Sequence, residues 1–89
     1  MASLTVSVIS PEKVLFQGEV ESVVAPAFDG EVGILPNHAP MVTLLGKGTL
    51  RLGVGGRSGR FAIEGGFLQV ADNHVRLVTE HAQELGAGS

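Results

Sequence analysis

Cysteine, tryptophan and tyrosine are absent from this chain of 89 residues. Without cysteine, the protein has neither a disulfide framework nor a thiolate metal site. The aromatic residues are limited to four phenylalanines, so a hydrophobic core must consist mainly of Val, Leu, Ile and Ala side chains.

Positive charge and long apolar runs are also scarce. The six Lys and Arg residues stand against nine Asp and Glu, give a formal net charge of -3, and form no cluster. Because nucleic-acid binding depends on clustered cations that displace phosphate counterions, we expect no nucleic-acid partner. The apolar runs are far shorter than the ~20 residues of a membrane span, and no segment resembles a signal peptide, so we expect no direct membrane insertion.

The chain does have a regular alternation of apolar and polar residues. Hydrophobic residues make up 44% of the sequence, which is ample for one small globular domain and argues against disorder. The alternation has a period of two, the pattern of half-buried strands. It covers residues 4–8, 20–24, 50–54, 60–64, 67–70 and 75–79.

The fold class is predicted from the alternation within each segment and from the turn residues between the segments. Val20, Ser22 and Val24 are predicted to share one face of a strand that ends before Pro26. The 13 Gly and four Pro residues supply turns between the segments. Many short strands with turn chemistry between them predict an all-β sandwich or barrel of about eight to ten short strands, without a substantial helix.

The C-terminal end interrupts the strand pattern. Residues Glu80 to Leu85 would allow a helix to begin, but a Gly-Ala-Gly-Ser sequence follows at once. We therefore predict a β-sandwich domain over residues 1–82 and a flexible C-terminal tail over residues 83–89.

Two glycine-rich segments invite comparison with phosphate-binding loops. Residues 53–59 fail the G-x-G-x-x-G pattern, because Ser58 stands at its third glycine position, and a hairpin loop is the better interpretation. Residues 46–49 resemble the end of a P-loop, but Gly48 separates the lysine from the threonine, and Met41 stands where the first glycine is required. Both segments are predicted to be turns.

The sequence also supports neither a metal site nor a covalent nucleophile. His38, His74 and His81 share no close spacing, and no paired carboxylate lies beside them in the sequence. The serines lack a nucleophile-elbow context. We therefore predict no catalytic residue, no metal and no cofactor, and a small metal-dependent enzyme stays a minor alternative.

Residues 28–40 are predicted to form a rigid exposed loop. Gly and Asp residues at its start favour positive φ, and two prolines lock φ and remove backbone donors. Such a loop presents the side chains of Glu31 and His38 to a partner. The residues expected at positive φ are Asp29, Gly30 and Gly33, and the prolines are Pro36 and Pro40.

Several collinear segments also match one known pattern. They are Val8–Glu12, Leu15–Val23, Gly30–Pro40, Gly48–Leu52, Ile63–Val70 and Val75–Thr79. Together they resemble the epsilon subunit of F-type ATP synthases, over most of the chain from Leu4 to Ala82. The segment over residues 30–40 carries the most recognisable motif of that family, in order and without a gap.

The resemblance implies a flattened β-sandwich at the foot of a rotor. In that family the domain binds the central gamma subunit and rests on the polar loops of the membrane c-ring. It rotates with both, so that proton flow drives the catalytic alpha/beta head indirectly. The resemblance also implies a peripheral position on the cytoplasmic face of the bacterial inner membrane, or on the equivalent organelle membrane.

The resemblance further implies two sets of contact residues. Glu31 is expected to meet a basic residue of the c-ring, with His38 at the rim of the gamma contact. Each has a simpler interpretation, as a solvated turn carboxylate and as a histidine bonded to its own loop. The full sets are Glu31, Asp29, Gly30 and Gly33 for the c-ring, and His38, Ser10, Met41, Val42 and Thr43 for gamma.

The other residues of the gamma set also have simpler interpretations. Ser10 and Thr43 would otherwise be ordinary turn or strand-end hydroxyls. The apolar run from Met41 to Leu45 exceeds what one strand face needs, so we expect it to serve both the core and an interface.

The chain departs from the family pattern after Ala82. Many members continue into two C-terminal helices that inhibit ATP hydrolysis and, in some, bind ATP, and the sequence given ends before such helices. An inhibitory or ATP-sensing role therefore does not carry over to it. The alternative function is a small β-sandwich binding module unrelated to the rotor, which would need a pocket rimmed by convergent polar groups.

Overall fold

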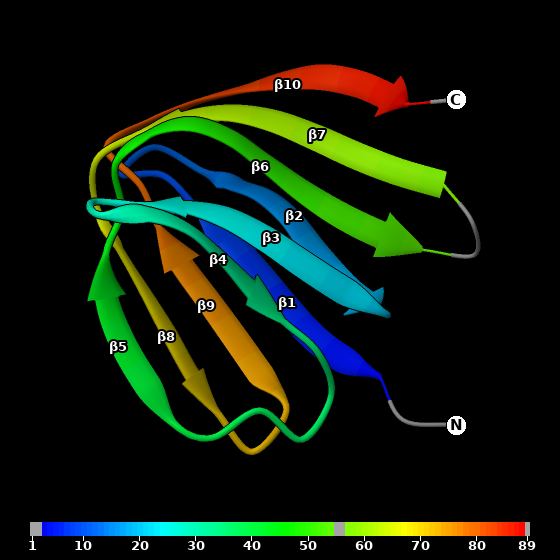
Figure 1. Cartoon of the computed structure of the whole chain (residues 1–89). Coiled ribbons are helices and arrows are strands. Elements are labelled where there is room, and N and C mark those ends of the chain that lie inside the picture. Colours follow the sequence, from blue (N-terminus) through cyan, green and yellow to red (C-terminus); the bar gives the residue numbers. More distant parts are fainter. Residues whose placement is uncertain (1–2, 55–56, 89) are drawn as a thin grey trace.

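The computed structural model describes residues 3–54 and 57–88, which fold into two facing β-sheets of five strands each (Figure 1). This confirms the predicted fold class, because the described residues form ten short strands and no helix. The strands are β1 (Leu4–Ile9), β2 (Val14–Val20), β3 (Ser22–Ala27), β4 (Gly30–Ile34), β5 (Met41–Leu44), β6 (Lys47–Val54), β7 (Arg57–Glu64), β8 (Phe67–Ala71), β9 (His74–Val78) and β10 (His81–Gly88).

We call the two layers sheet A and sheet B. Sheet A has the strand order β2-β1-β9-β8-β5, and sheet B has the order β10-β7-β6-β3-β4. Neighbouring strands are antiparallel except β1 and β9, which run parallel. β2 and β5 are therefore the edges of sheet A, and β10 and β4 are the edges of sheet B.

The period-two alternation places one side of each strand in the space between the sheets. Leu4, Val6 and Val8 of β1 are all fully buried, whereas Thr5 and Ser7 between them are half-buried on the other face. Each buried aliphatic side chain contributes about 1.5–3 kcal/mol relative to an exposed one. The buried apolar residues are Leu4, Val6, Val8, Val20, Val23, Ala25, Ile34, Leu45, Leu50, Leu52, Phe61, Ile63, Leu68, Val70, Val75 and Leu77.

Two tight hairpins follow the turn chemistry of the sequence. Asp72 and Asn73, with φ of 50° and 62°, connect β8 to β9 as the two positive-φ residues of a type I′ turn. The predicted hairpin over residues 53–59 is present, because Val54 of β6 pairs with Arg57 of β7. Its two connecting residues, Gly55 and Gly56, lie outside the described part of the chain.

The prediction of a single strand over residues 20–24 is wrong. β2 ends at Val20 in sheet A, and β3 begins at Ser22 in sheet B. Because the chain changes sheets at Glu21, the inward phase shifts, and Val23 rather than Val24 is buried. β3 also continues through Pro26, which pairs with Glu31 of β4.

The prediction of one rigid loop over residues 28–40 is also wrong in part. Residues 28–29 form the tip of the β3–β4 hairpin, Gly30 to Ile34 form edge strand β4, and only residues 35–40 form a loop. Gly30 has the expected positive φ, at 132°. Asp29, at the hairpin tip, and Gly33, within the extended strand, do not have the expected positive φ.

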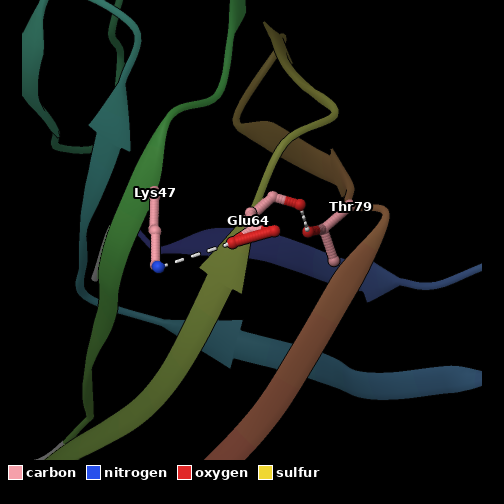
Figure 2. Close-up of polar contacts among 3 residues, drawn as sticks. All are labelled: Lys47, Glu64 and Thr79. Atoms are coloured by element: carbon pink, nitrogen blue, oxygen red, sulfur yellow. Dashed lines mark hydrogen bonds and ion pairs between the residues drawn. The ribbon is translucent and has the colours of Figure 1, made fainter.

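The helix considered at Glu80 to Leu85 is replaced by strand β10. Residues 81–88 pair with β7, so the predicted domain boundary at residues 82 and 83 falls inside a strand. The chain crosses from sheet A to sheet B at Thr79, which is 1% exposed. Its hydroxyl lies 2.9 Å from the carbonyl oxygen of His81. It also lies 3.4 Å from the carbonyl oxygen of Glu64 (Figure 2). Thr79 therefore links the crossing segment to the end of β7.

Candidate docking surfaces

The predicted c-ring residues lie together on the β3–β4 hairpin at the edge of sheet B. Asp29 lies at the hairpin tip beside Phe28, whose side chain is 67% exposed. Gly30, Glu31 and Gly33 follow on β4, and all three are exposed. A methyl group added at Gly33 would meet no atom within 4 Å, so that position is open to solvent or to a partner. We call these four residues, Asp29, Gly30, Glu31 and Gly33, the hairpin surface.

The carboxylate of Glu31 forms an ion pair within the chain. Arg51 of β6 donates from Nη2 to Oε2 of Glu31 at 3.2 Å. The two side chains are 48% and 63% exposed, so water screens their attraction and the pair contributes at most about 1 kcal/mol. Arg51 also stands directly opposite Arg60 of β7, and like charges in that position repel. Glu31 is therefore oriented by Arg51 but is not buried by it.

The predicted gamma residues on β5 divide between two sides of the edge strand. Met41 and Thr43 are half-buried, and Met41 packs against the core. Val42 and Leu44 point to the outer side and are 68% and 63% exposed. Leu45, just after the strand, is buried. This division agrees with the expectation that the run serves both the core and a surface.

The register of sheet A extends this apolar surface beyond the predicted residues. Leu44 pairs with Phe67, Phe67 with Val78, Val78 with Ile9, and Ile9 with Val14. A row of apolar side chains thus crosses all five strands on the outer face, with Leu44, Phe67 and Val14 exposed. We call this row together with Val42 the outer apolar face. The sequence carried a signal for it, since apolar residues occupy outward positions in all five neighbouring strands.

His38 and Ser10 lie at opposite ends of sheet A. His38 follows β4 in the loop over residues 35–40, where its Nδ1 lies 2.7 Å from the carbonyl oxygen of Ala39. Ser10 follows β1, next to the Leu44–Val14 row, and its hydroxyl lies 3.2 Å from the carbonyl oxygen of Lys13. Both side chains thus also make the local hydrogen bonds of the simpler interpretation. The outer apolar face lies at the Ser10 end of the sheet, and Gln69 and Arg76 stand between it and the His38 end.

The hairpin surface and the outer apolar face belong to different sheets and meet at one corner. The backbone N–H of Phe28 donates to the carbonyl oxygen of Leu44 at 3.0 Å, and Ala27 bridges to Leu45. These contacts fix the β3–β4 tip against the end of β5. The fold therefore presents two surfaces of different chemistry, one charged and rich in glycine, the other apolar, in a fixed relation.

The histidines considered for a metal site are separated in the fold. His38 lies in the loop before β5, His74 begins β9, and His81 begins β10. Within residues 3–54 and 57–88, no group of three His, Cys, Asp or Glu side chains is arranged to hold a metal ion. The same residues contain no helix long and apolar enough to cross a membrane.

Comparison with known proteins identifies the family. The sequence pattern described as ATP synthase, Delta/Epsilon chain, beta-sandwich domain matches residues 3–85. The chain belongs to this family. Among curated epsilon chains of ATP synthase, that of Leptospira borgpetersenii is 53% identical over 78 residues, and that of Desulforamulus reducens is 46% identical over 76 residues.

The alignments leave part of each of those epsilon chains unmatched. The alignments cover 88% and 85% of this chain, but 61% and 58% of the two relatives. The chain therefore spans about three fifths of the length of the curated relatives it matches.

Solved structures show the same fold. A chain in the Euglena gracilis mitochondrial ATP synthase structure, which includes F1 and the c-ring, superimposes with a TM-score of 0.89 at 27% identity. That superposition covers 96% of this chain and 55% of the Euglena chain. A chain in the central stalk and c-ring structure from Tetrahymena thermophila gives a TM-score of 0.74 at 19% identity, with 90% and 65% of the two chains covered. The similarity to the Tetrahymena chain concerns the fold and nothing beyond it.

Proposed function

We propose that this chain is a non-catalytic subunit of the central stalk of a proton-translocating F-type ATP synthase. In this role it links the gamma subunit to the c-ring and transmits rotation between them, and it acts on the alpha/beta head indirectly. The observation that carries the proposal is the pair of chemically different surfaces on two sheets of one epsilon-family sandwich. A subunit that joins two partners needs two such surfaces, held rigidly with respect to each other.

The hairpin surface is the proposed contact with the c-ring. Glu31 is exposed and Gly33 leaves the strand edge open, so a basic side chain of a ring loop has room to approach. Glu31 exchanges Arg51 for a basic residue of the ring at little cost in free energy, because the pair with Arg51 contributes at most about 1 kcal/mol. The contact therefore sets the register of the sandwich on the ring more than it sets affinity.

The outer apolar face of sheet A is the proposed contact with gamma. Exposed apolar patches of this kind mark protein–protein interfaces, and burial of the patch stabilises the complex through the hydrophobic effect. Ser10 lies beside the patch and Val42 lies within it, whereas His38 lies at the opposite end of sheet A. Met41 and Thr43 contribute mainly by supporting the edge strand from its inner side.

The proposed position in the cell follows from these partners. The chain is held at the membrane through the ring, as a peripheral subunit on the cytoplasmic face of a bacterial inner membrane or on the equivalent organelle membrane. The proposed function requires no cofactor, metal or nucleic acid.

Matched substitutions test the two surfaces separately. Glu31→Gln is expected to weaken binding to the c-ring, whereas Glu64→Gln serves as its control. Glu64 is also an exposed strand carboxylate paired with a cation of β6, since it lies 3.7 Å from Nζ of Lys47 (Figure 2). Leu44→Ser is expected to weaken gamma binding by about 10-fold, as truncation of an interface anchor does. Leu85→Ser, at a 43% exposed leucine of β10, is the corresponding control.

The assay is co-elution of the chain with gamma and with the c-ring from cells that express the whole complex. The proposal predicts that Glu31→Gln lowers co-elution with the c-ring, that Leu44→Ser lowers co-elution with gamma, and that both controls co-elute as the unsubstituted chain does. Failure of the unsubstituted chain to co-elute with gamma in mild salt would contradict the rotor function. That result would favour a binding module unrelated to the rotor.

A further inference from the structure

Three residues with unusual backbone conformations meet beside the His38 loop. Asn37, Asp72 and Asn73 have φ of 69°, 50° and 62°, and they are the non-glycine residues at positive φ in the described part of the chain. Such conformations are uncommon for residues other than glycine, and Asn and Asp tolerate them best. All three line one hollow of about 320 Å³ together with His38, Ala39 and Pro40. Their meeting at one place, from segments far apart in the sequence, calls for a physical reason.

The asparagines join the two segments through their amide groups. The backbone N–H of Asn37 donates to Oδ1 of Asn73 at 2.6 Å. The Nδ2 group of Asn73 in turn donates to Oδ1 of Asn37 at 3.4 Å. The pair spans 36 positions of sequence. We call this pair of hydrogen bonds the asparagine clasp.

One side of the clasp is anchored in sheet A. Asn73 occupies the type I′ turn between β8 and β9, which fixes its backbone. Its carbonyl oxygen also accepts a hydrogen bond from the N–H of Thr5, in β1, at 2.8 Å. The side chain of Asn73 therefore extends from a backbone that is held from two directions.

The other side of the clasp is the loop that carries His38. The N–H of His38 donates to the carbonyl oxygen of Leu35 at 3.2 Å, which closes a turn with Pro36 and Asn37 at its centre. Proline followed by a positive-φ residue is the pattern of a type II turn. Within the described residues, the hydrogen bonds that tie residues 36–39 to another element are those with Asn73.

We infer that Asn73 is a positioning residue for the gamma contact. It holds the turn over residues 35–38 against sheet A, so that His38 stands at a fixed place at the end of the sheet where β8 turns into β9. A loop ordered before binding loses less conformational entropy on binding, and the complex is tighter as a result. This inference rests on the proposed function, since it assigns the clasp to the gamma surface.

Glycine substitutions separate the clasp from the turn that carries it. Asn73→Gly keeps the positive φ of the turn and removes the amide, whereas Asp72→Gly makes the same backbone change at the neighbouring position without touching the clasp. Asn73→Asp keeps the Oδ1 acceptor for the N–H of Asn37 and serves as the rescuing variant. Both glycine substitutions raise the conformational entropy of the unfolded chain to a similar extent. A difference between the two variants therefore reports the loss of the clasp.

Two measurements on the whole 89-residue chain carry the test. The first is amide hydrogen exchange of Asn37, with Val75 and Leu77 as references in the core. Loss of one hydrogen bond of about 1 kcal/mol corresponds to a change of about 5-fold, so Asn73→Gly should speed exchange at Asn37 by at least that factor. The second is the affinity for purified gamma, which should fall by a similar factor. Asp72→Gly should leave both quantities near those of the unsubstituted chain, and Asn73→Asp, which keeps the acceptor for the N–H of Asn37 but loses the Nδ2 donor, should do so for exchange at Asn37.

The two measurements distinguish a failure of the clasp from a failure of its docking role and from a failure of the proposed function. Equal exchange at Asn37 in the two glycine variants would overturn the clasp itself. Faster exchange in Asn73→Gly with unchanged gamma affinity would overturn its docking role while leaving the proposed function intact. If the unsubstituted chain does not bind gamma, the proposed function fails and the docking role of Asn73 fails with it, whatever the exchange shows.

Discussion

Replacing Thr79 with valine tests how the chain is held where it crosses between the sheets. The substitution preserves the β-branched shape and removes the hydroxyl, which lies 2.9 Å from the carbonyl oxygen of His81 and 3.4 Å from that of Glu64. Thr79 is 1% exposed, so water cannot replace the lost donor. The substitution therefore removes the side-chain link between the crossing and the end of β7.

The expected loss of stability follows from two opposing contributions. Removing the donor on this buried side chain costs about 1–3 kcal/mol, because a carbonyl oxygen loses that hydrogen bond. The new methyl group regains up to about 0.8 kcal/mol by burial. We expect Thr79→Val to lower the free energy of unfolding by about 1–2 kcal/mol, and the melting temperature by about 5–15 °C for a domain of this size.

Urea unfolding followed by far-UV circular dichroism is the suitable assay, because the chain has no tryptophan or tyrosine for intrinsic fluorescence. Thr49→Val is the control, since Thr49 is half-buried on β6 and its hydroxyl makes no hydrogen bond within the described residues. Surface changes of that kind stay within about 0.5 kcal/mol. A loss for Thr79→Val that is no larger than the loss for Thr49→Val would refute the reasoning.

Three further predictions use the same unfolding assay. Gly66→Ala should cost more than about 3 kcal/mol, because Gly66 has φ of 103° and an added Cβ would overlap the carbonyl oxygen of Val78, whereas Gly33→Ala should change stability by less than about 0.5 kcal/mol. Equal effects of these two alanines would contradict the backbone geometry. Arg51→Ala should change stability by less than about 1 kcal/mol at any salt concentration, because its exposed pair with Glu31 is offset by the facing Arg60; a larger loss would mean that the pair is structural. Removal of residues 83–89 should cost about 1–3 kcal/mol, since it deletes most cross-strand pairs of β10, and a truncated chain of unchanged stability would instead support the flexible tail.

The sequence predicted those parts of the fold that depend on local alternation. Val75, Leu77 and Thr79 are buried as their spacing required, and Asp72 and Asn73, which are residue types that favour turns, form the turn between β8 and β9. These features depend on neighbouring residues, whose periodicity and turn preference are visible in one sequence. Features that depend on which sheet a strand joins were not visible in this way.

The wrong predictions share that cause. Nothing in the local pattern shows that the chain changes sheets at Glu21, so the inward phase of the next strand was assigned to Val24 instead of Val23. β10 was missed because its glycine-rich end favours no regular structure by itself. Its strand conformation comes from hydrogen bonding to β7, which supplies partners along its length.

The candidate contact residues were assigned through the family resemblance, whereas the groups that position them were not. Arg51 lies 20 positions from Glu31, and Asn73 lies 36 positions from Asn37. Both pairs arise only when the fold brings distant segments together. Long-range side-chain pairs of this kind leave no periodic signal in the sequence.

Cysteine cross-linking tests the central claim most directly, because the chain contains no cysteine and each introduced thiol is unique within it. We predict that Glu31→Cys cross-links to the c-ring and Val42→Cys to gamma in the assembled complex, whereas Glu64→Cys and Leu85→Cys cross-link to neither. Cross-linking of Glu31→Cys and Val42→Cys to the same partner, or to neither partner, would contradict the account of two docking surfaces on two sheets.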